Sequence, residues 1–203
     1  MLRYGNSKIG HIYNFSLPAF KTCPGKTEFC SRFCYGVRGC YAQKHTINAL
    51  ENNFNQSQQP DFCNPLKREI TSIKCKIIRI HVVGDFYSEC YINQWINIAK
   101  EFPNKTFYAY TRSWRVQSLL EPLNRLRQLD NCFISASTDF THPDLPDSSW
   151  RVVSINGDGI PCPHDSNENI NCLDCKLCFT GNNNISFKVK HLSKSKNLSQ
   201  LLI

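Results

Sequence analysis

Two clusters of cysteine near opposite ends of the chain constrain its fold more than any other feature of the sequence. Eight of the twelve cysteines belong to these clusters: Cys23, Cys30, Cys34, Cys40, Cys162, Cys172, Cys175 and Cys178. The segment from Met1 to Gly10 lacks the apolar stretch of a secretory signal. We therefore expect a reducing compartment, where clustered thiols bind metal more often than they form disulfides. The fold must then position thiolates from both ends of the chain.

The C-terminal cluster has the spacing of a four-iron ligand set. It contains Cys162 followed by Pro163, and then Cys172, Cys175 and Cys178 at intervals of two residues. Bacterial ferredoxins hold a cubane with three cysteines at such intervals and a distant fourth that precedes proline. Zinc is the alternative, because four thiolates also satisfy a structural zinc ion. With iron, four protein ligands predict a closed 4Fe-4S site suited to structure or electron relay.

The N-terminal cluster has wider spacing and predicts a more open site. Six residues separate Cys23 from Cys30, three separate Cys30 from Cys34, and Cys40 follows. Three thiolates can hold a second 4Fe-4S cluster and leave its fourth iron free for another ligand. Cys40 closes the site if it is the fourth ligand. A zinc site is again the alternative.

The remaining four cysteines stand alone in the sequence. They are Cys63, Cys75, Cys90 and Cys132. A free cysteine usually packs as a small hydrophobic side chain, so we expect these four to be buried in the core.

Between the two clusters, strand-like and helix-like patterns alternate along the chain. The predicted strands are His11–Leu17, Ile77–Val83, Thr106–Tyr110, Cys132–Ser137, Trp150–Ile155 and Ile185–Val189. The second of them is nearly continuous in β-branched residues, which is typical of a strand buried on both faces. Because Arg79 and His81 interrupt it, this stretch is not a membrane span, and we expect no membrane association.

Apolar residues at helical spacing predict helices after two of these strands. One covers Ser88–Phe102, and the other covers residues 119–126, where Pro122 is expected to kink or restart the helix. The alternation predicts an α/β fold, a partial parallel (β/α) barrel of about six strands. We expect this barrel to occupy residues 1–157 and a cysteine-rich extension with a basic tail to occupy residues 158–203.

Polar residues follow four of the predicted strands. They are Gly84 and Asp85, the run Thr111-Arg112-Ser113, the group Ser135, Ser137 and Asp139, and the run Asn156-Gly157-Asp158. The carboxyl ends of parallel strands meet at one mouth, where ligands bind in α/β folds. The same residue types also serve as turn formers and helix caps. Their recurrence at four strand ends favours a binding site.

The charge of the chain suggests a second class of function. The chain carries 24 basic and 16 acidic side chains, which gives a net charge of +8. Its C-terminal tail contains Lys188, Lys190, Lys194 and Lys196, with Phe187 beside them. Basic residues interspersed with aromatic ones are typical of nucleic-acid binding. A zinc-stabilised nucleic-acid-binding accessory protein is therefore the alternative function, although such a tail is also typical of a solvated terminus.

Several runs of residues, spread over most of the chain, resemble the gene product 88 family of phages and mobile elements. The runs are Asn6-Ser7-Lys8, Phe15-Ser16-Leu17-Pro18-Ala19, Thr22-Cys23-Pro24-Gly25, Cys30, Cys34-Tyr35, Arg79-Ile80-His81-Val82-Val83-Gly84-Asp85-Phe86 and Tyr108-Ala109-Tyr110-Thr111-Arg112-Ser113. The resemblance implies a phage or mobile-element protein that acts in the cytoplasm of the host cell.

That family in turn resembles phage-type radical-AdoMet proteins, whose cysteine motif is widened by an insertion. The resemblance implies that Cys23, Cys30 and Cys34 hold a cluster with one open iron. It also implies that S-adenosyl-L-methionine binds there and is cleaved to a 5′-deoxyadenosyl radical once an electron donor has reduced the cluster. The last cysteine gap of this chain is three residues, where the phage-type motif has two. The resemblance does not specify the substrate.

The same resemblance assigns residues to the AdoMet site. Together with the serines that end the fourth predicted strand, the cofactor-binding set is Gly84, Asp85, Phe86, Thr111, Ser135 and Ser137. Asp85 stands where radical-AdoMet enzymes have a glutamate that meets the methionine amino group, and Arg112 can pair with a carboxylate. Asp85 and Arg112 are therefore the predicted catalytic residues.

Overall fold

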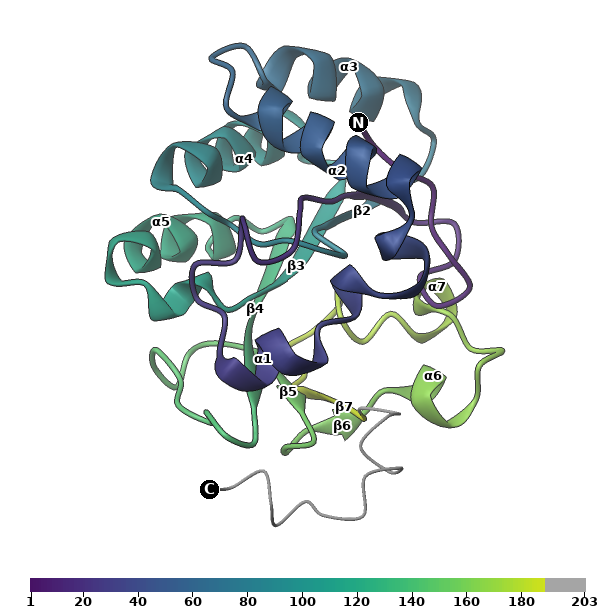
Figure 1. The fold of residues 1–203 in the computed structure, drawn as a ribbon, viewed down its shortest axis with the longest axis vertical. Coiled ribbons are helices and arrows are strands. Elements are labelled where there is room, and N and C mark those ends of the chain that lie inside the picture. Colours follow the sequence, from purple (N-terminus) through teal and green to yellow (C-terminus); the bar gives the residue numbers. More distant parts are fainter. Residues whose placement is uncertain (189–203) are drawn as a thin grey trace.

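The computed structural model describes residues 1–188 and shows an α/β fold built on one parallel sheet (Figure 1). Seven strands form the sheet in the order β1-β2-β3-β4-β5-β7-β6, and every neighbouring pair is parallel. The strands are β1 (Tyr13–Phe15), β2 (Ile77–Ile80), β3 (Thr106–Thr111), β4 (Cys132–Asp139), β5 (Val152–Ile155), β6 (Ile160–Pro161) and β7 (Ile185–Phe187). The first five strands lie side by side in chain order.

Longer helices connect the early strands, and short helices carry both cysteine clusters. The α-helices are α1 (Glu28–Phe33), α2 (Lys44–Ser57), α3 (Cys63–Ser72), α4 (Glu89–Glu101), α5 (Gln117–Arg127), α6 (Pro163–Ser166) and α7 (Cys172–Cys175). Three short 3-10 helices are η1 (Tyr35–Val37), η2 (Gly39–Ala42) and η3 (Ser113–Arg115). No helix of the described part of the chain is both long enough and apolar enough to cross a membrane.

The sheet separates two hydrophobic cores, because successive side chains of a strand point to opposite faces. In β3, Phe107 and Ala109 pack with α3, α4 and α5 in the larger core. Tyr108 points to the opposite face and packs in a smaller core with Cys162, Cys178 and other residues of the chain ends. One face of the sheet is thus covered by helices, and the other by the segments that carry the cysteines.

The structure confirms the α/β class and adds elements that the sequence pattern did not predict. All six predicted strand segments contain a strand, and β6 is a seventh that was not expected. Helix α4 matches the predicted helix Ser88–Phe102 to within one residue at each end. Helix α5 continues through Pro122, so of the kink or restart expected there, the restart does not occur. Helices α2 and α3 were not predicted.

The segment after residue 157 joins the same sheet as the rest of the chain. Strand β7 pairs with β5 through Val153 and Ile185, and β6 pairs with the other edge of β7. The cysteine-rich segment is therefore connected to the sheet by backbone hydrogen bonds. Of the predicted basic tail, Lys190, Lys194 and Lys196 lie outside the described residues.

Removing the N-cap of α4 should destabilise the chain modestly. The Ser88 side chain accepts a hydrogen bond of 3.3 Å from the backbone N–H of Tyr91, which satisfies one free donor of the first turn. We expect Ser88→Ala to lower the free energy of unfolding by about 1 kcal/mol. Urea denaturation measures the change. The exposed mid-helix substitution Asn52→Ala in α2 is the control, and an equal effect of both would contradict a capping role.

Candidate functional site

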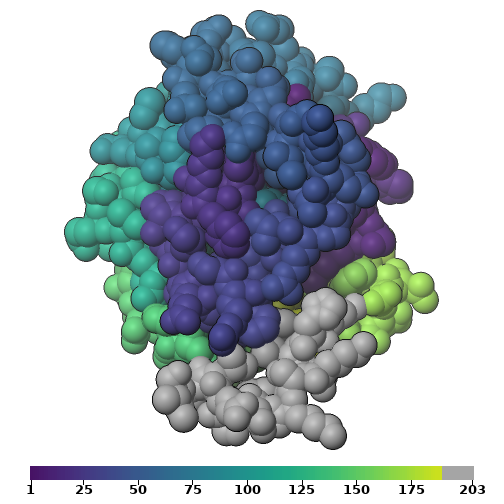
Figure 2. Space-filling view, in the orientation of Figure 1, coloured from purple at the N-terminus to yellow at the C-terminus, as the bar shows by residue number. Residues whose placement is uncertain are grey.

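A cavity of about 510 Å³ lies on the face of the sheet opposite the helices, toward the carboxyl ends of the strands. Its volume is that of a typical small-molecule or cofactor site. Figure 2 shows the N-terminal residues and the C-terminal cysteine segment sharing the face that is turned to the viewer. Seven cysteines line the cavity: Cys23, Cys30, Cys34, Cys162, Cys172, Cys175 and Cys178. The fold therefore brings cysteines from both ends of the chain to one place.

The loop after β1 and helix α1 hold the N-terminal cysteines. Thr27 caps α1, since its hydroxyl oxygen accepts a 3.0 Å hydrogen bond from the backbone N–H of Cys30. The same hydroxyl donates to the Asp139 carboxylate at 2.9 Å, which connects α1 to the end of β4. A side chain at Gly25 would place its Cβ 1.9 Å from the carbonyl oxygen of Arg112. Glycine therefore allows this loop to lie directly against the end of β3.

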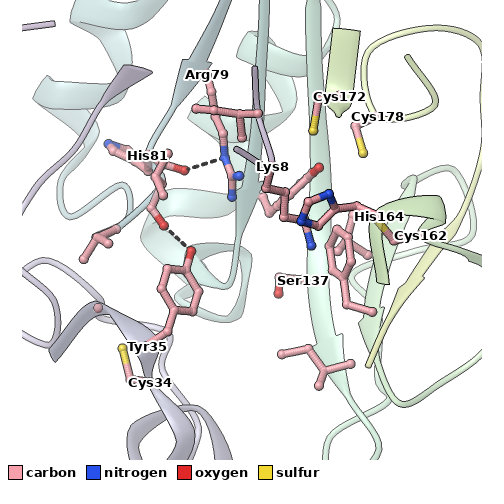
Figure 3. A pocket seen from close by; sticks show the side chains of 18 of the residues that line it. Lys8, Cys34, Tyr35, Arg79, His81, Ser137, Cys162, His164, Cys172 and Cys178 are labelled. Atoms are coloured by element: carbon pink, nitrogen blue, oxygen red, sulfur yellow. Dashed lines mark hydrogen bonds between the residues drawn. The ribbon is translucent and has the colours of Figure 1, made fainter. Parts of the chain in front are cut away.

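Two short helices hold the C-terminal cysteines. Cys162 is the N-cap of α6, and α7 begins and ends with Cys172 and Cys175. Asn171 caps α7 by accepting hydrogen bonds from the backbone of the first turn. Lys176 then adopts a left-handed conformation with φ of 59°, which turns the chain back and places Cys178 at the cavity. Figure 3 shows Cys162, Cys172 and Cys178 on one side of the cavity and Cys34 on the other.

Burial favours the protonated thiol at most of the cavity cysteines. Burial raises the pKa of Cys23 to about 12 and that of Cys172 to about 11, and nearby negative charges add to both shifts. Burial also raises the pKa of Cys30, Cys34 and Cys178. Metal ions bind the thiolate, so loading a metal here must release protons. Within residues 1–188, no three histidine, cysteine or acidic side chains are grouped closely enough to hold a metal ion.

Cys40 and the isolated cysteines lie away from this cavity. Cys40 is exposed in η2 and does not line the cavity wall. Of the four isolated cysteines, Cys132 is buried as expected, whereas Cys63 and Cys75 are half-buried. The expectation of burial is wrong for Cys90, which is exposed in the first turn of α4.

Asp85 connects the ends of β2 and β3 at the cavity wall. One carboxylate oxygen accepts hydrogen bonds from the backbone N–H of Phe86 at 2.7 Å and from the Thr111 hydroxyl at 2.6 Å. The other accepts from the backbone N–H of Arg112 at 2.8 Å. Burial raises the pKa of Asp85 to about 6, although these hydrogen bonds act in the opposite direction. The carboxyl group thus lines the cavity, and its pKa lies nearer to neutral pH than that of an ordinary aspartate.

Arg112 is already paired within the protein. Its guanidinium lines the cavity and forms a buried ion pair of 2.7 Å with Asp139 at the end of β4. A second nitrogen donates to the carbonyl of Thr138 at 3.2 Å. Burial raises the pKa of Asp139, but the Thr141 hydroxyl and the charge of Arg112 outweigh it, so that the pKa is lowered overall. Arg112 therefore contacts a ligand only with the part of its guanidinium that these partners leave accessible.

The other predicted cofactor residues divide between the cavity and the protein interior. Gly84 and Ser137 line the cavity. Gly84 has φ of 83°, and a Cβ there would lie 2.6 Å from the Cβ of Leu17. Phe86 and Ser135 are fully or almost fully buried and do not line the cavity, and neither does the predicted Thr111. Phe86 packs in the larger core, so its side chain is structural.

The structure also adds cavity residues that were not assigned to a site from the sequence. They include Lys8, Arg79, Tyr110 and His164. Tyr110 on β3 lies close enough to Cys178 to affect the pKa of its thiol, and Arg79 on β2 does the same for Cys172. The signal in the sequence was the position of Arg79 inside an otherwise apolar strand. A charged side chain in such a strand must have a polar environment on one face of the sheet.

Asp85 should make the stability of the chain depend on pH in the acidic range. Its pKa is about 6 in the folded chain and 3.8 ordinarily, so the folded state keeps a proton that the unfolded state has released. The stabilisation from this group is full below about pH 4 and is lost as the pH rises to about 6. Relative to Asp85→Asn, the wild-type free energy of unfolding should fall by about 1 kcal/mol per pH unit over this range. Urea denaturation of both proteins at pH 4.5, 5.5 and 7 tests the sign. A wild type that becomes more stable relative to Asp85→Asn as the pH rises would contradict it.

Comparisons with known proteins place the chain in a family. The model of the family described as "Gene product 88" matches residues 3–155. The Gene 88 protein of Mycobacterium phage L5 is 26% identical over 217 aligned residues, which cover 90% of this chain and 89% of that protein. The Gene 88 protein of Mycobacterium phage D29 is 24% identical with the same coverage. No solved structure matches the chain. Because the family model covers most of the chain, the protein belongs to the gene product 88 family.

Proposed function

We propose that the protein binds two 4Fe-4S clusters and acts as a minimal enzyme of the radical-AdoMet type. The N-terminal cluster is held by Cys23, Cys30 and Cys34, with one iron left open. The C-terminal cluster is held by four cysteines and is closed. The observation that supports this proposal is that all seven of these cysteines, from both ends of the chain, line one cavity.

The residues around the cavity fit this assignment in their chemistry. Thiolates are the ligands that iron–sulfur clusters require. The volume of about 510 Å³ leaves space for a ligand beyond the thiols themselves. Tyrosine and arginine side chains beside Cys172 and Cys178 supply the polar surroundings that tune such centres.

The position of Cys40 supports the open character of the N-terminal cluster. Cys30 and Cys34 both raise the pKa of Cys23, and Cys34 raises that of Cys30, whereas Cys40 is exposed and outside the cavity. Three thiolates then face the cavity, and one iron is left for a small-molecule ligand. An open-iron cluster of this kind, when reduced, supplies the electron that cleaves S-adenosyl-L-methionine.

The order of the strands supports the proposal of a partial barrel. Strands β1 to β5 follow chain order, helices α3, α4 and α5 pack on one face, and the cavity opens on the other. Active sites of (β/α) barrels lie at the carboxyl ends of the strands. Asp85 and Gly84 follow β2 at this end, where Asp85 can accept a hydrogen bond from a ligand amino group.

Anaerobic reconstitution with iron and sulfide tests the cluster assignment. We expect a brown protein with about eight iron atoms and about eight sulfides per chain. A colourless protein with stoichiometric zinc would contradict this assignment. Nucleic-acid binding with a steep salt dependence by such a zinc protein would support the alternative function instead.

A separate assay tests the enzymatic part of the proposal. The reconstituted protein is incubated with S-adenosyl-L-methionine and dithionite, and 5′-deoxyadenosine is measured by chromatography. We expect its formation by the wild type and its loss in Cys34→Ala. A brown protein that forms no 5′-deoxyadenosine would retain the cluster assignment and exclude the enzyme.

A further inference from the structure

Arg79 is a buried cation that faces the cavity. It is the third residue of β2, and 9% of its side chain is exposed. Its Nε donates a 3.1 Å hydrogen bond to the carbonyl oxygen of His81, and its guanidinium carbon lies 4.8 Å from the centre of the Tyr110 ring. Figure 3 shows the guanidinium between Cys34 on one side and Cys172 on the other, with its terminal nitrogens directed into the cavity.

No carboxylate forms an ion pair with Arg79 among residues 1–188. The other buried arginine of the cavity, Arg112, has Asp139 at 2.7 Å, and Lys8 has Asp165 at 3.2 Å. The guanidinium of Arg79 keeps its charge at any ordinary pH, and a buried charge without a partner is strongly unfavourable. The fold therefore maintains a cation at a cost in stability, which is typical of functional residues.

The walls of the cavity carry an excess of positive charge. The basic residues that line it are Lys8, Lys26, Arg79, Arg112, Lys176 and Lys188, of which Lys8 and Arg112 are already paired with carboxylates. Asp85 is the one acidic residue of the described chain in this lining, and its pKa is raised to about 6. A cavity of this charge favours an anionic occupant.

We propose that Arg79 binds an oxyanion, a carboxylate or a phosphate, of the small molecule that enters the cavity. Arginine presents a planar fork of N–H donors that matches both groups. The stacking of the guanidinium on Tyr110 and the hydrogen bond to His81 fix this fork before the ligand arrives. That this molecule is the substrate rests on the proposed function, whereas the anion site itself does not. An iron–sulfur cluster with thiolate ligands is also an anion, so the experiment must separate the two occupants.

Calorimetric titration of the full chain with sodium phosphate and, separately, with sodium acetate tests the site. Both titrations are run at constant ionic strength, on the chain after chelation of metals and on the iron-loaded chain. The variants are Arg79→Met, which keeps the length of the side chain, and Arg79→Lys, which keeps its charge. Arg115→Met is the control, because Arg115 is exposed and lies outside the cavity lining.

We expect wild type and Arg115→Met to bind one of the two anions with equal affinity. Arg79→Lys should bind that anion more weakly than wild type, and Arg79→Met should bind it at least tenfold more weakly than wild type. The anion that binds identifies the group as carboxylate or phosphate. We also expect metal-free Arg79→Met to unfold at a higher urea concentration than wild type, because it no longer buries an unpaired charge.

Equal binding by wild type and Arg79→Met would overturn the inference. So would a wild type that binds neither phosphate nor acetate, whether it is metal-free or iron-loaded. A lower urea midpoint for Arg79→Met would assign the residue a structural role. Anion binding by a chain that takes up no iron would retain this site and exclude the proposed function.

Discussion

Replacing Cys23, Cys30 and Cys34 together by alanine is expected to reduce the iron content of the reconstituted protein from about eight atoms per chain to about four. These three side chains line the cavity, and Figure 3 shows one of them, Cys34, across the cavity from Cys162, Cys172 and Cys178. Under the proposed function, the C-terminal cysteines hold a separate cluster. The variant should stay brown, because the closed cluster remains. It should form no 5′-deoxyadenosine, because the open iron is lost. Iron and sulfide analysis measures the first effect, and chromatography measures the second.

Two single substitutions serve as controls for this triple variant. Cys40 and Cys90 are both exposed and outside the cavity, so Cys40→Ala and Cys90→Ala should retain about eight iron atoms. A loss of about four iron atoms in Cys40→Ala would show that Cys40 is a ligand and that the N-terminal site is closed. Full iron content in the triple variant would contradict the assignment of its three cysteines.

Replacing Asp139 by alanine is expected to destabilise the chain by about 3–5 kcal/mol. The Asp139 carboxylate pairs with Arg112 at 2.7 Å, accepts from Thr27 at 2.9 Å and caps the backbone N–H groups of Thr141 and His142. Its removal leaves the Arg112 guanidinium buried without a partner. The loss is a large share of the roughly 5–15 kcal/mol by which a domain of this size is stable. Urea denaturation under reducing conditions measures it.

A second pair of variants separates the ion pair from a general effect of substitution. Asp147→Ala removes an exposed carboxylate that bonds to Ser149, and it should cost far less stability than Asp139→Ala. In the double variant Arg112→Met with Asp139→Leu, no buried charge remains unpaired, so most of the stability should return. A double variant less stable than Asp139→Ala would show that the packing of these side chains, and not their charge, dominates.

The parallel sheet could be predicted because its strands are marked by strong local signals. Strand β2 opens a largely β-branched run that is followed by Gly84-Asp85, and α4 has buried apolar residues at regular helical spacing. Helix α2 lacks such a signal. Its buried residues are Thr46, Leu50, Asn53 and Ser57, so its inner face has helical spacing but is mostly polar. Asn53 is buried because its amide bonds to the carbonyl of Ser16 at 3.0 Å, a contact that depends on tertiary structure.

The candidate site could be predicted as two separate cysteine groups, but not as one cavity. The spacing of Cys172, Cys175 and Cys178 is local information, and α7 with its following turn places all three at the cavity. The meeting of this group with the N-terminal loop depends on the pairing of β7 with β5, which brings the last part of the chain back to the sheet. Phe86 is a residue that the sequence assigned to the site and that the structure places in the core. It follows a strand end, yet its ring packs in the core against His81 and Tyr91.

Mössbauer spectroscopy of the protein reconstituted with iron-57 tests the central claim most directly. Seven cavity cysteines and two cubanes of four irons leave one iron without a thiolate. We predict that nearly all the iron belongs to 4Fe-4S clusters, and that about one iron in eight changes its signal when S-adenosyl-L-methionine is added. Iron present only as mononuclear or adventitious species, or no retained iron at all, would contradict the account.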